Sequence, residues 1–344
     1  MVEVSPKAGP IRIDYWRYLA VLLFLFLLLF LLLWGVLGSQ WGAGNPWAEF
    51  FRKHLSRLNK FRPSAKPEDN LANALRIFRV ERLSGNRYAF LFSLTDEYGD
   101  AISPVPRSDV TIAVGDPGAT PRPVAIDRIT PLRDLGSWGN RVSFSAVMDY
   151  SGSMFPEDLD AIEQNYSTFI NGIAFPFSAS IVKFHSQVDE ILPLSPSLTD
   201  IESAIKRRIP LGGTALFNGM MKGLETIRPR EHLRFLLLTT DGNNNIAGSS
   251  LEDVITDSRQ SFIPTFVFGF GWLKVDVLKR ISDETDGFYV YVPDSADLKN
   301  KFPKMADIVN KVQVAEFSST IDIQPGSPLE ITVNTKNGVL KRTR

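Results

Sequence analysis

The stretch 144–153 contains an apolar run that stops abruptly on an acidic residue. Its first five residues, Phe-Ser-Ala-Val-Met, have the composition of a buried β-strand. Asp149 follows them, and Ser151 and Ser153 are spaced behind it. In an open α/β sheet, ligands bind in the crevice beyond the carboxyl ends of the strands, which is where Asp149 would lie. The stretch therefore predicts the floor of a metal site at the end of a strand.

Two later loops add oxygen-bearing side chains in a similar setting. Gly212-Gly213-Thr214 opens a helix-like stretch, and Asp241 closes a second apolar run that ends Leu-Thr-Thr-Asp-Gly. A glycine beside a candidate ligand lets the backbone approach closely. The five candidate ligands are Asp149, Ser151, Ser153, Thr214 and Asp241.

The pattern around these loops predicts a largely parallel sheet. Strand-like apolar runs alternate with stretches of helical period, and such an alternation is typical of sheets covered by helices on both faces. One helix is expected to begin at Pro156, with Glu157 and Asp158 in its first turn. The runs 181–184 and 188–192 are expected to pair as a hairpin. The fold class is therefore α/β, a doubly wound and mostly parallel sheet.

The order and context of these residues resemble the von Willebrand factor A domain and its metal-ion-dependent adhesion site. This resemblance implies a Rossmann-like fold over residues 141–312. It also implies that Asp149, Ser151 and Ser153 are direct metal ligands, and that Thr214 is a ligand in the ligand-bound state. Asp241 would bind the ion directly or through water.

Five oxygen ligands with only two carboxylates describe a hard divalent cation, Mg²⁺ or Mn²⁺ before Ca²⁺ and well before zinc. Such a site leaves positive charge and an open position for an Asp or Glu carboxylate of a protein partner. Taken singly, Asp149 and Thr214 are ordinary helix caps and Asp241-Gly242 is an ordinary tight turn. Their joint occurrence in the order of the family favours the metal.

A run of twenty residues without a charge, Tyr18–Leu37, is long enough as a helix to span roughly 30 Å of hydrocarbon. We expect a transmembrane helix at 18–38 after a cytoplasmic tail at 1–17. A cleaved signal peptide is the alternative, but the run exceeds the usual apolar region of such peptides. Lys7, Arg12 and Arg17 precede the run and no Lys or Arg follows it before Arg52, which favours soluble domains outside the cytoplasm.

Residues 39–70 form a basic juxtamembrane segment and linker. Its helical spacing of apolar residues suits either an amphipathic helix on the lipid headgroups or a soluble stalk helix. Residues 71–140 are rich in strand patterns, such as the alternating Phe90, Phe92 and Leu94. We expect residues 313–344, with strands at 321–323 and 329–333, to complete one small β-sandwich with them.

Composition excludes several functions. The 38 basic and 38 acidic residues balance, so the whole chain has no electrostatic footprint for nucleic acid. The chain lacks cysteine, which rules out thiolate sites and disulfides. Hydrolase elbows and lysine-bearing phosphate loops are missing, so we expect no enzyme.

These observations together indicate a single-pass protein on the outer side of a bacterial membrane. Its function would be metal-dependent protein binding, or adhesion. The alternative is a structural or assembly subunit of a membrane complex, in which the metal only shapes the loops and the juxtamembrane segment engages lipid or another subunit.

Overall fold

The computed structural model describes residues 70–344 except 137–141, 155, 271–273, 294 and 325. Pro67–Arg344 form one compact unit. The predicted membrane helix at 18–38 and most of the juxtamembrane segment fall outside the described residues. In the part of the chain that is described, no helix is both long and apolar enough to cross a membrane.

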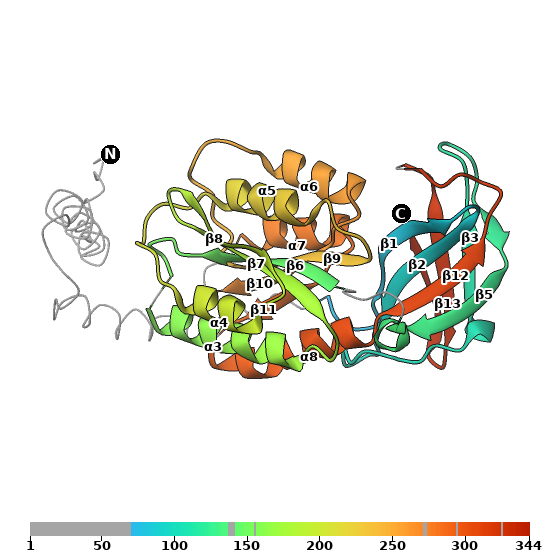
Figure 1. The fold of residues 1–344 in the computed structure, drawn as a ribbon, viewed down its shortest axis with the longest axis horizontal. Helices are drawn as coiled ribbons and strands as arrows, with labels where there is room; N and C mark the ends of the chain where they lie inside the picture. Colours follow the sequence, from blue (N-terminus) through green and yellow to red (C-terminus); the bar gives the residue numbers. More distant parts are fainter. Residues whose placement is uncertain (1–69, 137–141, 155, 271–273, 294, 325) are drawn as a thin grey trace, which may run out of the picture. The chain divides into compact units, whose positions relative to one another are not determined.

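A six-stranded sheet forms the centre of the larger domain (Figure 1). Five of its strands run parallel, and the edge strand β8 pairs antiparallel with β7. Every residue of the central strands β6 and β9 is buried, because helices cover both faces of the sheet. In sheet order the strands are β11 (Tyr289–Val292), β10 (Thr265–Phe270), β9 (Leu233–Thr240), β6 (Val142–Asp149), β7 (Phe177–Phe184) and β8 (Val188–Ser195).

Helices cover both faces of this sheet, as Figure 1 shows. The predicted doubly wound, mostly parallel α/β arrangement is thereby confirmed, and the expected hairpin over 181–192 forms as the antiparallel pair β7 and β8. The helix expected at Pro156 begins there, and the acids Glu157 and Asp158 occupy its first turn. One face carries α3 (Pro156–Gly172), α4 (Leu198–Lys206) and α8 (Leu298–Asn310); the other carries α5 (Leu216–Ile227), α6 (Leu251–Gln260) and α7 (Val275–Glu284).

Two four-stranded sheets share a second hydrophobic core and form a β-sandwich from both ends of the described chain. The first sheet has the order β1 (Leu75–Ser84), β2 (Arg87–Leu94), β12 (Gln313–Ser318) and β5 (Ile126–Pro131). The second has the order β14 (Gly338–Thr343), β13 (Leu329–Thr335), β3 (Val110–Val114) and β4 (Arg122–Val124). Short 3₁₀ helices lie at Arg107–Asp109, Leu132–Asp134 and Ser295–Asp297.

Strand β2 is buried on both faces, whereas its alternation predicted a strand with one buried face. Phe90 and Phe92 point into the core of the sandwich. Ala89 and Leu91 point the other way and belong to the core that the sandwich shares with the larger domain. The second face is covered because this sheet packs directly against the larger domain.

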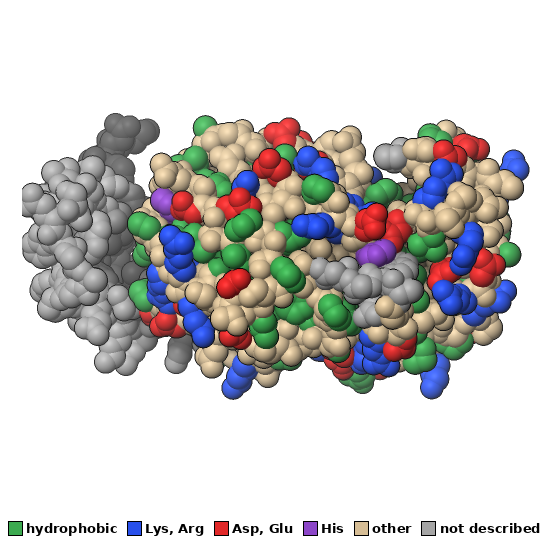
Figure 2. Space-filling model, viewed as in Figure 1, with side chains coloured by type: hydrophobic (Ala, Val, Ile, Leu, Met, Phe, Trp, Pro, Cys, Tyr) green, Lys and Arg blue, Asp and Glu red, His purple; other side chains and the backbone are tan. Residues whose placement is uncertain are grey.

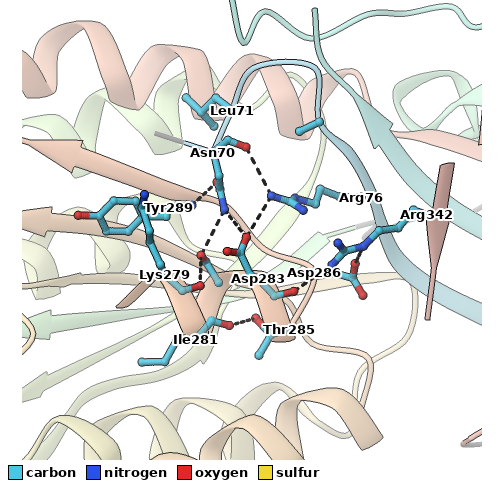
Figure 3. Close-up of polar contacts among 12 residues, drawn as sticks. Asn70, Leu71, Arg76, Lys279, Ile281, Asp283, Thr285, Asp286, Tyr289 and Arg342 are labelled. Atoms are coloured by element: carbon cyan, nitrogen blue, oxygen red, sulfur yellow. Dashed lines mark hydrogen bonds and ion pairs between the residues drawn. The ribbon is translucent and has the colours of Figure 1, made fainter. Parts of the chain in front are cut away.

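Polar contacts close the junction between the two domains (Figure 3). Asn70 pairs with the edge strand β11: its N–H donates to the carbonyl of Tyr289 at 3.2 Å, and its Oδ1 accepts from the Tyr289 N–H at 2.6 Å. Arg76 lies 3.4 Å from Asp283, and Arg342 lies 2.7 Å from Asp286. Asp283 and Asp286 flank the end of α7, so charged side chains of the sandwich hold that end.

One expected strand does not form. Ile321 and Ile323 lie in an irregular segment, and the strand that precedes the carboxyl-terminal hairpin is β12, a few residues earlier. The Ser319 side chain explains the break, because its Oγ accepts a hydrogen bond from the Ile321 N–H at 3.0 Å. A side-chain acceptor of this kind competes with the ladder for backbone donors. Both isoleucines still pack against the sandwich core.

Candidate metal centre

Asp149 is the last residue of β6 and only 1% exposed. Its carboxylate accepts two hydrogen bonds. Oδ1 accepts from the Ser151 N–H at 2.8 Å, and Oδ2 accepts from the Thr240 hydroxyl at 2.6 Å. Because β6 and β9 are parallel neighbours, the Thr240 hydroxyl reaches Asp149 from the end of the adjacent strand. The carboxylate is therefore held in one orientation at the carboxyl edge of the sheet.

The two serines lie on the turn between β6 and α3. Ser151 is buried and Ser153 is exposed, and their Oγ atoms are 3.0 Å apart. The Gly152 N–H donates to the carbonyl of Gly212 at 2.7 Å, and Ser151 forms a parallel bridge with Gly212. This backbone contact ties the serine turn to the loop that carries Thr214.

Thr214 is 3% exposed and lies two residues before α5. Its N–H donates to Asn245 Oδ1 at 2.7 Å, and its carbonyl accepts from the Asn245 N–H at 3.0 Å. The next N–H, that of Ala215, donates to the carbonyl of His185 at 2.8 Å. Thr214 is thus fixed between the loop after β9 and the end of β7.

Asp241 follows β9 directly and is 7% exposed. Its Oδ1 accepts from the Asn243 N–H at 3.1 Å and from Asn243 Nδ2 at 3.2 Å. Gly242 has a φ of +85°, a conformation that glycine adopts at little cost, and its N–H donates to Thr240 Oγ1 at 3.0 Å. The sharp turn after β9 therefore places Asp241 at the same sheet edge as Asp149.

Burial raises the pKa of Asp149 to about 6. The hydrogen bonds from Ser151 and Thr240 lower it, and the negative charge of Asp241 raises it further. No Lys, Arg or His among the described residues forms an ion pair with Asp149 or Asp241. A buried carboxylate without a cationic partner is unfavourable, and a bound cation would compensate for it. The residues present therefore fit a hard divalent cation.

The donor set is unusual because hydroxyls contribute most of it. Over the described ranges, no three His, Cys, Asp or Glu side chains group closely enough to hold an ion. The candidate centre instead combines the carboxylates of Asp149 and Asp241 with the hydroxyls of Ser151, Ser153 and Thr214. The five predicted residues lie at the end of β6, on the loops that follow β6 and β9, or on the loop that precedes α5.

Two residues near the centre were not predicted from the sequence. Thr240 was treated as the end of an apolar run, although it donates to Asp149. Asn245, on the loop after β9, holds Thr214 through both its side chain and its backbone. The Thr-Thr-Asp ending offered a signal for Thr240. Successive residues of a strand point to opposite faces of the sheet, so one of the two threonines must face the same side as Asp149.

A family model for the von Willebrand factor type A domain matches residues 145–304, which extend from β6 into α8. The chain contains a von Willebrand factor type A domain. Its A domain thus carries the candidate centre, with the sandwich strands contributed from outside the matched residues. The search of curated proteins produced no match.

Several solved structures are similar to this chain in fold. The conserved hypothetical protein BatB from Bacteroides thetaiotaomicron is 17% identical, with a TM-score of 0.42 over 48% of this chain and 98% of that one. A von Willebrand factor type A protein from Catenulispora acidiphila is 12% identical, with a TM-score of 0.45 over 83% and 74%.

A third similar structure is that of proximal thread matrix protein 1 from the mussel byssus, with a zinc-occupied MIDAS motif. It is 18% identical, with a TM-score of 0.46 over 56% of this chain and 49% of that one. This chain thus spans about half the length of the mussel protein.

Proposed function

We propose that the A domain is a protein-binding module that acts through a divalent cation held by Asp149, Ser151, Ser153, Thr214 and Asp241. The observation that supports this most directly is the environment of Asp149. Its carboxylate is buried, accepts hydrogen bonds only from neutral groups and has no cationic partner among the described side chains. Burial of an unpaired charge is costly, so a cation at this edge stabilises the fold and the site together.

We further propose that the cation is Mg²⁺ or Mn²⁺. Oxygen ligands suit these hard ions, and Ca²⁺ generally takes more ligands than this edge provides. Three of the five ligands are neutral hydroxyls, so the ion keeps net positive charge. Such an ion supplies an attraction for an Asp or Glu carboxylate of a protein partner.

Calorimetry on the full-length chain in detergent tests the cation site. Titration with Mg²⁺ or Mn²⁺ is expected to show one site in the wild type and none in Asp149→Asn. The matched control is Asp276→Asn, since Asp276 is an exposed carboxylate in the first turn of α7. Equal cation uptake by wild type and Asp149→Asn would refute the assignment.

We also propose binding rather than catalysis, and two described histidines are engaged with acidic side chains. Within the described segments, His185 lies 3.3 Å from Asp189, and His232 lies 2.7 Å from Glu81. The second pair joins the A domain to β1 of the sandwich. Each histidine thus contacts an acidic side chain, and the contact of His232 lies at the domain junction.

The membrane anchor at 18–38 and an extracytoplasmic location remain part of this proposal, supported by the charges before the apolar run. On the face shown in Figure 2, Lys/Arg and Asp/Glu side chains are interspersed.

Protease added to cells with an opened outer envelope should cut the soluble domains. If these domains survive while a periplasmic control is cut, the orientation is the reverse of the one proposed.

The alternative is an assembly subunit in which the cation only shapes the loops. The two roles differ in what a chelator does to partner capture. If the cation contacts the partner, crosslinking to the partner should be lost when EDTA is added before the crosslinker, and it should be lost in Thr214→Asp. Partners retained under both conditions would support the assembly role.

A further inference from the structure

Lys183 is a fully buried lysine on β7, one residue before the strand ends. Its ammonium donates to the hydroxyl of Tyr150 at 2.9 Å and to the carbonyls of Ile205 and Arg207, each at 2.6 Å. An ammonium has three donors, so these contacts use all of them. Ile205 and Arg207 lie at the carboxyl end of α4, where unpaired carbonyls favour a cation.

Tyr150 connects this lysine to the serine turn and to α3. It is the residue between Asp149 and Ser151, and its hydroxyl donates to Glu163 Oε1 at 2.6 Å. Arg208 Nε lies 3.0 Å from the same Glu163 oxygen. The contacts therefore form a network that includes the serine turn, α3, β7 and the chain just after α4.

The network lies at the start of the segment that delivers Thr214 to the candidate centre. This segment, 205–214, is attached to Lys183 at its beginning. Near its end, Gly212 accepts from the Gly152 N–H, and the Gly213 N–H donates to Ser186 Oγ at 2.6 Å. The position of Thr214 relative to Asp149 thus depends on anchors at both ends of one short loop.

Packing alone does not explain a charged side chain at this position. An apolar residue of similar volume at a buried site is often as stable as a buried ionic group, because desolvation of the charge offsets much of its attraction. The ammonium does what an apolar side chain cannot: it holds the carbonyls of Ile205 and Arg207, in one segment, and the hydroxyl of Tyr150, in another, at fixed distances. Its benefit is therefore geometric.

We propose that Lys183 and Tyr150 are positioning residues for the candidate metal centre. They hold segment 205–214 against the serine turn, and this contact sets the affinity of the centre for a divalent cation. The inference rests on the proposed function. Without the anchor, the loop samples more positions, and cation binding must order it again at an entropic cost.

The test compares Lys183→Met, Tyr150→Phe and the control Lys222→Met in the full-length chain in detergent. Lys222 is a partly exposed lysine on α5 of the same domain, paired with Glu190. Three quantities are measured for each variant. They are Mn²⁺ affinity, free energy of unfolding, and hydrogen exchange of the Gly213 and Thr214 amides in chelator.

We expect Lys183→Met to unfold cooperatively but to bind Mn²⁺ about tenfold more weakly, the loss that corresponds to roughly one buried hydrogen bond. Exchange at Gly213 and Thr214 should rise by a similar factor without any cation. Tyr150→Phe should show a smaller loss, since Lys183 keeps both carbonyl acceptors. Lys222→Met should match the wild type in Mn²⁺ affinity and in exchange.

Wild-type Mn²⁺ affinity in a folded Lys183→Met would overturn the proposal. So would lower stability with unchanged exchange at Gly213 and Thr214, because that result describes a merely structural lysine. If Lys183→Met does not fold, Tyr150→Phe decides by the same two readouts. A wild type that binds no cation refutes the proposed function, whereas the exchange measurement in chelator still decides whether Lys183 positions the loop.

Discussion

The hydroxyl of Thr240 donates to Asp149 Oδ2 at 2.6 Å, and both residues are almost completely buried. They are the last residues of two neighbouring parallel strands, β9 and β6. The register of the sheet therefore determines the orientation of the carboxylate before any cation binds. The same hydroxyl accepts from the Gly242 N–H at 3.0 Å, so it also shapes the turn that carries Asp241.

Thr240→Val keeps the shape of the side chain and removes this hydroxyl. We expect the free energy of unfolding without cation to fall by about 1–3 kcal/mol, because a buried charged group loses a donor. Mn²⁺ affinity should fall as well, since Asp149 is freer to turn. Thr239→Val is the control, because the adjacent residue of a strand faces the opposite side of the sheet. Equal Mn²⁺ affinity in the two variants would contradict the orienting role.

Thr214→Ala should weaken partner binding more than it weakens Mg²⁺ binding. Thr214 is neutral and comes from a separate loop, so it can act in the partner-bound state while Asp149 holds the ion throughout. A ligand shifts an equilibrium only through such a difference between states.

Thr214→Asp should also impair partner binding, because a third carboxylate neutralises the ion and repels an incoming acid. Both affinities can be measured by calorimetry once crosslinking has identified the partner and it has been purified. Wild-type partner affinity in Thr214→Asp would place the contact surface away from the ion.

The domain junction should weaken in acid through Glu81. Burial alone raises the pKa of Glu81, but hydrogen bonds from His232 and the charge of Arg79 outweigh it and lower the pKa below 4.5. The stability that this contact contributes is therefore present above about pH 4.5 and is lost as the pH falls through the folded pKa.

Urea unfolding between pH 7 and pH 3 checks this dependence on acid. The wild type should lose more stability than Glu81→Gln, which carries no carboxylate to protonate. Glu97→Gln is the control, because Glu97 is exposed. Parallel pH profiles for wild type and Glu81→Gln would show that Glu81 does not account for the effect.

Ile331→Ala should destabilise the sandwich while sparing the candidate centre. Ile331 is fully buried on β13 and belongs to the sandwich core, which is separate from the cores of the A domain. Truncation of a buried Ile costs about 2–5 kcal/mol. Hydrogen exchange should increase in β3 and β13, whereas Mn²⁺ affinity stays unchanged. A large loss of Mn²⁺ affinity would show that the sandwich supports the centre directly.

Local pattern in the sequence was sufficient for several features of this protein. The apolar run that ends on Asp149 predicts a strand that β6 matches closely, and Pro156 with its following acids predicts where α3 begins. Parallel strands end at one edge, so residues such as Asp149 and Asp241 that follow two of them are placed together by topology. These inferences need only neighbours along the chain and the geometry of a parallel sheet.

Only the tertiary structure decided which groups pair with the buried polar side chains. It also decided which segment covers the second face of a strand such as β2. Lys183 meets Tyr150 across 33 positions of sequence, Thr240 meets Asp149 across 91, and His232 meets Glu81 across 151. The second face of β2 is buried only because the A domain packs on it. The spacing of hydrophobic residues along the sequence indicates which side of a helix or strand is apolar. It carries no information on which distant segment covers that side. A buried donor or charge must find a partner, and folding of the whole chain decides which group that is.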